Sequence, residues 1–145
     1  MFKGKYFYTV DSKNRLSIPA KLRKYISQEA QNTIIIQLGL NKCLQLYPYD
    51  KYKTMMERLN KLNPFDPEQA YVKRRILEEV YEEELDGQYR IKLPTELLKK
   101  VNITREVIIL GQSDYMEVWN PEEYEKYKNE FAEPYEKVVQ RVMNE

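Results

Sequence analysis

The N-terminal segment contains two stretches with the side-chain pattern of β-strands, the second of which alternates between polar and apolar residues. Residues 5–10 are rich in aromatic and β-branched side chains, and Leu16 and Ile18 lie two positions apart in the next segment. A period of two places one side of a strand in the core. The polar residues 12–14 between the two segments are typical of a tight turn. The pattern therefore predicts a β-hairpin over residues 5–18.

A short helix and two further strands are predicted next. Pro19 has no backbone donor but suits the first turn of a helix, so we expect a helix over residues 20–26. Residues 33–38 are rich in β-branched side chains and residues 43–47 are mostly apolar, with a loop around Gly39 between them, so both segments are predicted strands. The predicted order of elements is β-β-α-β-β.

This unit occurs twice in the chain. Residues 11–19, Asp-Ser-Lys-Asn-Arg-Leu-Ser-Ile-Pro, recur 75 positions later as residues 86–94, Asp-Gly-Gln-Tyr-Arg-Ile-Lys-Leu-Pro. Asp, Arg and Pro occupy the same slots, and the apolar residues keep the same alternation. A unit of roughly fifty residues buries little surface alone. We therefore expect an α+β fold in which two pseudo-symmetric repeats pack into one β-rich domain.

Helical segments are predicted between and after the repeats. Residues 49–62 have helical periodicity, and Asp66 with the following proline has the residue types of a helix start, for a helix reaching Tyr81. A charged helix is predicted from Pro121, with an interruption near Pro134. The predicted division is a first repeat over residues 1–52, a helical connector over 53–80, a second repeat over 81–124 and a C-terminal helical tail over 125–145.

Composition narrows the classes of function. The chain has 24 basic and 23 acidic residues, so its total charge predicts neither a nucleic acid nor a membrane as partner. It has no histidine, which removes the commonest general base and zinc ligand, and its four glycines form no phosphate-binding loop. We expect no enzyme activity, no catalytic residue, no metal, no cofactor and no small-molecule substrate.

The same data bear on the compartment of the protein. The sequence has no apolar run of the 18 or more residues that would cross a bilayer, and its first residues lack the apolar stretch of a signal peptide. The single cysteine, Cys43, has no internal partner and lies in an apolar strand, where core packing is its expected role. A soluble protein of the cytoplasm, with no membrane partner, is expected.

The repeated Asp-x-x-x-Arg spacing brackets each predicted hairpin turn and allows two interpretations. In the structural one, Asp11 and Asp86 accept hydrogen bonds from turn amides, and the arginine pairs with the aspartate to brace the loop. In the functional one, the tip projects Arg15 toward an anion such as a phosphate, or toward a guanine edge. We predict the structural role for the aspartates and the functional role for Arg15.

Cations are distributed unevenly between the two copies. Residues 1–28 contain seven basic residues and one acidic residue, whereas residues 82–101 contain four basic and five acidic residues. Because nucleic-acid affinity depends on cations that displace counterions from phosphates, the first copy is the predicted DNA-binding one, the alternative being a solvated lysine surface. The candidate DNA-binding residues are Lys3, Lys13, Asn14, Arg15, Lys21, Arg23 and Lys24, with Arg90 as the candidate from the second copy.

Phosphate contacts by one hairpin would give dissociation constants of only about 10⁻⁴ to 10⁻⁶ M at physiological salt. A symmetric homo-oligomer that presents Arg15 at regular intervals would gain affinity through multivalency. Such an assembly would favour a DNA site built of repeats.

The chain resembles the MraZ family of bacterial transcriptional regulators, which are built from two AbrB-like repeats. The resemblance rests on Gly4 and the first strand, residues 11–23, residues 39–48, the second Asp-x-x-x-Arg, residues 107–111, and residues 116–119 with the following helix. It implies double-stranded promoter DNA as partner, with repeated boxes in the promoter of the division and cell-wall gene cluster, and a nucleoid-associated location. It also implies a ring-shaped homo-oligomer, expected to be an octamer, and a DNA-binding role for Arg15.

The resemblance leaves two points open. The residue before the arginine is usually glycine in the family but is Asn14 in the first copy and Tyr89 in the second, where Gly87 is expected to move the tight bend. We therefore expect the second hairpin to serve mainly in packing against the first. The alternative function is an antitoxin-like protein-interaction module, because AbrB-like folds also occur in antitoxins.

Overall fold

The computed structural model describes residues 1–144 and contains the two predicted repeats. The first repeat consists of β1 (Lys5–Thr9), β2 (Arg15–Ser17), α1 (Ala20–Arg23), β3 (Thr33–Leu38) and β4 (Cys43–Pro48). The second consists of β5 (Tyr81–Glu84), β6 (Arg90–Lys92), α4 (Thr95–Lys100), β7 (Glu106–Gly111) and β8 (Met116–Trp119). The predicted α+β class and the β-β-α-β-β order are confirmed.

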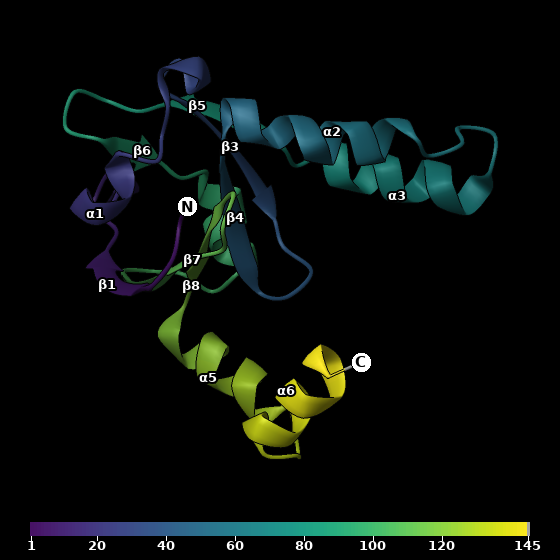
Figure 1. Ribbon diagram of the computed structural model, residues 1–145. Helices are drawn as coiled ribbons and strands as arrows, with labels where there is room; N and C mark the ends of the chain where they lie inside the picture. The colour runs from purple at the N-terminus through teal and green to yellow at the C-terminus, as the bar shows by residue number, and fades with distance from the viewer. Residues whose placement is uncertain (145) are drawn as a thin grey trace.

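Further helices lie between and after the repeats. The 3-10 helix η1 (Gln28–Ala30) precedes β3, and η2 (Tyr49–Tyr52) leads into α2 (Lys53–Asn60) and α3 (Pro67–Leu77). After β8 come α5 (Pro121–Asn129) and α6 (Tyr135–Met143). Figure 1 shows a β-rich body from which two helix pairs, α2–α3 and α5–α6, project in different directions.

The predicted hairpin is wrong in its strand pairing. Residues 11–15 do form a tight turn, in which the Asp11 N–H donates to the Arg15 carbonyl at 3.0 Å and the Asn14 N–H donates to the Asp11 carbonyl at 3.0 Å. The two strands that flank it, however, enter different sheets. Strand β1 pairs antiparallel with β7, and β2 pairs antiparallel with β6. Alternation specifies which face of a strand is buried but not which strand lies beside it.

The strands of the two repeats are interleaved. One sheet has six strands in the order β1-β7-β8-β4-β3-β5, and the other is a two-stranded ribbon of β2 and β6. The first strand of each repeat therefore pairs with the third strand of the other, as β1–β7 and β5–β3. Neither repeat has a complete set of strand partners within itself.

The main core lies between the ribbon, the short helices and one face of the sheet, here called the inner face. Leu16 of β2 and Ile91 of β6 are fully buried, and Leu22 of α1 and Leu97 of α4 are each only 1% exposed. These residues occupy matching slots in the two repeats. Both short helices therefore serve the core in equivalent ways, as expected for a pseudo-symmetric pair.

The opposite face of the sheet, here called the outer face, is covered by two helical segments. At one side, Tyr52 and the methionines of α2 pack on Ile35 and Tyr47. At the other side, Tyr124 and Tyr127 of α5 pack on Trp119, with ring centroids 5.1 and 5.2 Å from its ring. Cys43 is buried in the second cluster, as predicted, and burial raises the pKa of its thiol to about 12.

Two predicted helix ends are wrong, by three and four residues. Helix α1 ends at Arg23 rather than at Ile26, and α3 begins at Pro67 with Asp66 as its cap, as predicted, but ends at Leu77. Tyr81, the predicted end of that helix, instead begins β5. Pairing of β5 with β3 overrides the helical pattern there, because it satisfies the backbone of β3 at the sheet edge.

The C-terminal segment is helical with the predicted interruption. The Asn120 side chain caps α5, which ends at Asn129, and α6 begins directly after Pro134. Within residues 1–144, no helix combines the length and apolar character needed to span a bilayer.

Candidate nucleic-acid interface

The first Asp-x-x-x-Arg segment is a turn held together by one carboxylate. Oδ1 of Asp11 accepts hydrogen bonds from the backbone N–H groups of Lys13 at 2.9 Å and Arg15 at 2.8 Å. Oδ2 accepts from Nε of Arg15 at 2.8 Å. The carboxylate thus fixes both the backbone of the turn and the side chain of the arginine.

The second segment repeats this geometry. Oδ1 of Asp86 accepts from the backbone N–H groups of Gln88 at 2.8 Å and Arg90 at 2.9 Å, and Oδ2 accepts from Nε of Arg90 at 2.7 Å. The two turns are here called the Asp–Arg turns. Their agreement, atom for atom, shows that the sequence repeat specifies the same local structure twice.

Both aspartates are held in the charged form. The backbone hydrogen bond from Arg15 is the main cause that lowers the pKa of Asp11. Desolvation opposes it, and the hydrogen bond from the Arg15 side chain lowers the pKa further. The same causes lower the pKa of Asp86. At neutral pH each arginine therefore has an ionised partner.

The bend lies at the same position in both turns. Asn14 has φ +62° and Tyr89 has φ +56°, both in the left-handed region. The expectation that Gly87 moves the bend of the second turn is wrong, since the positive φ falls on Tyr89. Hydrogen bonds between the repeats explain this, because the carbonyl of Asn14 accepts from Leu93 N–H at 2.8 Å and that of Tyr89 accepts from Ile18 N–H at 2.9 Å.

The ribbon brings the two turns together. In the register of β2 with β6, Arg15 lies opposite Lys92, and Ser17 lies opposite Arg90. Because Leu16 and Ile91 point into the core, these four residues share the other face of the ribbon, here called the solvent face. Arg15 and Arg90 are then diagonal neighbours, about 7–8 Å apart at Cα by ordinary strand geometry.

The guanidinium groups are partly exposed on this face. The side chains of Arg15 and Arg90 are 30% and 26% exposed. Each uses Nε for its aspartate, and within residues 1–144 no hydrogen bond engages the terminal Nη atoms of either arginine. The paired N–H donors that an arginine offers to phosphate or guanine therefore stay accessible in a fixed orientation.

The remaining predicted residues divide into those with and those without partners in the fold. The Asn14 side-chain amide donates to Oγ1 of Thr95 at 3.0 Å. Nε of Arg23 donates to the Ile18 carbonyl at 2.9 Å, and its guanidinium lies 5.0 Å from the centre of the Tyr89 ring. Asn14 and Arg23 thus connect the repeats, so fewer of their hydrogen-bond donors remain free for a ligand.

Three predicted lysines gather beside the N-terminal strand. Lys3, Lys21 and Lys24 line one shallow hollow together with Tyr6 and Tyr25. Lys13, at the first turn, is exposed. Figure 1 shows α1 and β6 on one side of the molecule, opposite the α2–α3 helix pair, so these cations lie on the same side as the ribbon.

Sequence reasoning missed Lys92. It occupies the slot of Ser17 in the second repeat and lies opposite Arg15. The same reasoning counted the glutamates of β5 against Arg90, although β5 lies at the edge of the six-stranded sheet and not in the ribbon. The repeat offset of 75 could have identified Lys92, but its position beside Arg15 depends on pairing between the repeats.

Other kinds of site find no support in the part of the chain that the structure describes. Residues 1–144 contain no group of three or more His, Cys, Asp or Glu side chains placed to hold a metal ion. The two Asp–Arg turns can present paired arginines, each held by a carboxylate, to an anionic surface.

Known proteins are similar to this chain in sequence. The chain matches the family described as "MraZ protein, putative antitoxin-like" twice, over residues 1–75 and 76–144. A protein named transcriptional regulator MraZ from Thermomicrobium roseum is 34% identical over 124 residues, which cover 86% of this chain and 84% of that protein. Its namesake from Clostridium tetani is 32% identical over 142 residues, covering 98% and 96%. The one from Mesoplasma florum is 30% identical over 142 residues, covering 98% and 95%.

Proposed function

The chain belongs to the MraZ family of transcriptional regulators, and from this premise we propose that it binds promoter DNA sequence-specifically through the solvent face of its ribbon. The family is not one of enzymes, in keeping with the expectation from composition. The proposed target is a set of repeated boxes in the promoter of the division and cell-wall gene cluster. The proposed place of action is the cytoplasm, at the nucleoid.

One observation carries the proposal: Arg15 and Arg90 lie on the same face of a two-stranded ribbon, each held by its own aspartate. A guanidinium makes paired hydrogen bonds to O6 and N7 of guanine or to a phosphate. Because the aspartates already fix both side chains, little conformational entropy remains to be lost on binding. Both Asp–Arg turns then contribute, rather than the first alone.

The shape of the element also suits duplex DNA. The major groove is about 12 Å wide and admits a two-stranded β-ribbon. The ribbon of β2 and β6 is short, with three paired residues in each strand. It would reach base edges with Arg15 and Arg90, while Lys92, opposite Arg15, and Lys13, in the turn before β2, would contact phosphates.

The surrounding lysines would supply affinity without sequence preference. Lys3, Lys21 and Lys24 line a hollow beside the N-terminal strand, where they can approach the sugar-phosphate backbone. Each phosphate that they neutralise releases counterions, so binding should weaken as salt rises.

We further propose a ring-shaped homo-oligomer, an octamer as the resemblance implies. One ribbon offers few base contacts, so a single copy would bind a short box weakly. In an oligomer, binding of one ribbon to a box makes binding of the other ribbons to neighbouring boxes intramolecular, which raises the affinity for DNA with repeated boxes.

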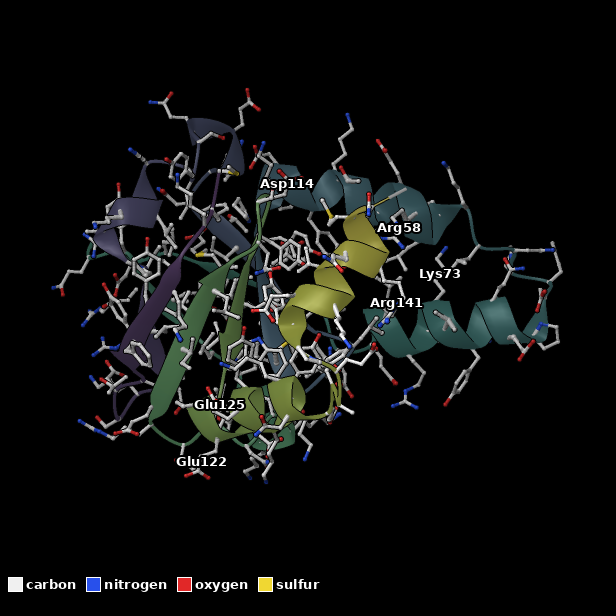
Figure 2. The ribbon with its side chains drawn as sticks, turned by 60° about the horizontal axis from the view of Figure 1, so that its bottom comes forward. Arg58, Lys73, Asp114, Glu122, Glu125 and Arg141 are labelled. Atoms are coloured by element: carbon white, nitrogen blue, oxygen red, sulfur yellow. The ribbon has the colours of Figure 1, made fainter. Side chains whose placement is uncertain are left out.

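Binding of the promoter upstream of the protein's own gene tests the proposal. In a salt titration, Arg15→Ala and Arg90→Ala should each weaken binding by about 1–3 kcal/mol on the promoter and less on a scrambled duplex. Arg58→Ala is the matched control, because Arg58 is exposed and lies on α2, away from the N-terminal strand (Figure 2). The proposal fails if wild-type protein does not distinguish the promoter from the scrambled duplex, or if both ribbon variants bind like Arg58→Ala.

A second candidate function is an antitoxin-like protein-interaction module. The observation that favours it is the exposed apolar surface of the C-terminal segment, where Phe131, Tyr135 and Met143 are 52%, 77% and 77% exposed. An apolar interface of this kind would resist salt, whereas DNA binding through the ribbon would not. The same titration therefore separates the two functions.

A further inference from the structure

The six-stranded sheet has β1 at one end and β5 at the other. The residues that flank β1 show which of its positions bond to β7. The Gly4 carbonyl accepts a hydrogen bond from β7 at 2.9 Å, and the Val10 N–H donates to the carbonyl of the residue before β7 at 2.7 Å. Because antiparallel strands use alternate residues for these bonds, Lys5, Phe7 and Thr9 direct their backbone N–H and C=O groups away from the sheet. Strand β1 thus presents a row of backbone groups at a free edge.

Strand β5 presents the same kind of edge. The Leu85 N–H donates to the Asn32 carbonyl at 2.7 Å, which fixes the alternation in this pair. Glu82 and Glu84 therefore direct their backbone groups away from β3. A free edge is a template for another strand, and charged side chains on it, such as the glutamates of β5, disfavour pairing with an edge of like charge.

The β1 edge carries an exposed aromatic side chain. Phe7 is 69% exposed on the outer face of the sheet, and the ammonium of Lys5 lies 5.4 Å from the centre of its ring. Strand β1 has no proline and a single charge. Within residues 1–144, the outward backbone groups of this edge pair with no other strand, and the Phe7 ring stays largely exposed despite its contact with Lys5.

The β5 edge carries complementary features on the same outer face. Glu82 and Glu84 are exposed there. Beside Glu82 lies a hollow whose apolar lining comes from β3, α2 and the residues around the end of α3, with two further carboxylates at its rim. One of these, Asp50, has a buried Oδ1 atom with no hydrogen-bond partner. The lining residues include Ile35, Met56, Leu77 and Val80.

Charge decides which edges can pair. Two β1 edges would bring Lys5 near Lys5, and two β5 edges would bring four glutamates together, whereas β1 against β5 brings Lys5 near Glu82 and Glu84. We propose that β1 of one copy pairs with β5 of the next copy and that Phe7 packs against the hollow beside Glu82. This inference rests on the homo-oligomer proposed above and assigns its interface.

The proposed contact is heterologous, because it joins two different surfaces. Repetition of such a contact closes into a ring when the rotation per subunit divides a full turn, and otherwise gives a filament. Every subunit would then have both of its sheet edges paired, which removes the exposed edges of the single chain.

The first test removes one of the backbone N–H groups of β1 that face away from β7. The molar mass is then measured by light scattering at micromolar concentration. Phe7→Pro removes an N–H that faces away from β7, so the pairing of β1 within the chain is preserved. Phe7→Leu is the control, because it keeps the N–H and an apolar side chain. We expect an oligomeric wild type, an oligomeric Phe7→Leu and a Phe7→Pro variant at least tenfold more dissociated, with the circular dichroism of a folded chain.

The outcomes separate the two proposals. A monomeric wild type would refute the homo-oligomer itself and with it this interface. An oligomeric wild type with an equally oligomeric Phe7→Pro would leave the homo-oligomer standing and overturn the assignment of its interface.

A second test uses exposed side chains, which removes any dependence on folding of the proline variant. Lys5→Glu makes both edges acidic, and the double variant Glu82→Lys and Glu84→Lys makes both edges basic. Each protein alone should have a lower mass than wild type, and an equimolar mixture should recover the wild-type mass, because unlike edges then alternate. Wild-type masses for both proteins, or a mixture that stays dissociated, would overturn the inference.

Discussion

Each arginine of the ribbon is fixed by an aspartate four residues earlier in the chain. The spacing predicts that the aspartate accepts from the amides of its own turn, whereas its pairing with the arginine is one of two interpretations that the sequence allows. The left-handed backbone of Tyr89 could not be predicted in this way, since tyrosine rarely adopts it. It results from the hydrogen bond between Ile18 and the Tyr89 carbonyl, which joins the two repeats.

Substitution of Tyr89 should reveal the cost of that backbone conformation. Both Tyr89→Ala and Tyr89→Gly remove the ring that packs under Arg23, but only glycine tolerates φ +56° without strain. We expect Tyr89→Gly to be more stable than Tyr89→Ala by about 1 kcal/mol, the reverse of the usual order. Urea denaturation of the two variants measures the difference, and an alanine variant of equal or higher stability would contradict the expectation.

The elements themselves follow closely from the sequence, whereas their pairing does not. Strand β3 spans the predicted residues 33–38, and α3 begins at the predicted proline. Local pattern specifies such elements because β-branched segments and caps act within a few residues. Pairing of β2 with β6 connects positions 75 residues apart, so neither it nor the nearness of Arg90 and Lys92 to Arg15 follows from local pattern.

The pairing of β1 with β7 depends on a glycine at the end of β7. A Cβ at Gly111 would lie 2.1 Å from the backbone N of Lys3 and 2.5 Å from the carbonyl carbon of Phe2. Gly111→Ala should therefore displace the N-terminal segment and destabilise the protein by about 1–3 kcal/mol, the usual range for overpacking. The free energy of unfolding in urea measures this loss.

Gly87→Ala is the matched control for that substitution. A Cβ at Gly87 would meet no atom within 4 Å, and its φ lies outside the left-handed region. Because alanine reduces the conformational freedom of the unfolded chain, the free energy of unfolding of this variant should equal that of the wild type or exceed it by up to about 1 kcal/mol. If Gly111→Ala and Gly87→Ala lower the free energy of unfolding by the same amount, the close approach of the Lys3 backbone to Gly111 is not required for the pairing of β1 with β7.

The whole molecule is one folding unit despite its two repeats. Strands β1 and β2 find their partners only in the second repeat, and β5 and β6 find theirs only in the first. A repeat separated from the other would leave half of its strands unpaired and half of the shared core exposed to water. The repeats are thus related by sequence and symmetry without being independent domains.

Division of the chain in the loop between α2 and α3 tests this interdependence. The loop contains Phe65, which is 91% exposed, so a cut there disturbs little of the core. Residues 1–63 and 64–145 should each be largely unfolded as monomers, because each can complete its sheet only by exchanging strands with a second molecule. Mixed in equal amounts, they should restore the circular dichroism and cooperative melting of the intact chain, at a midpoint that rises with concentration. Either fragment folding cooperatively as a monomer, at a midpoint independent of concentration, would show that a single repeat can complete its own sheet and that the exchange is not required for folding.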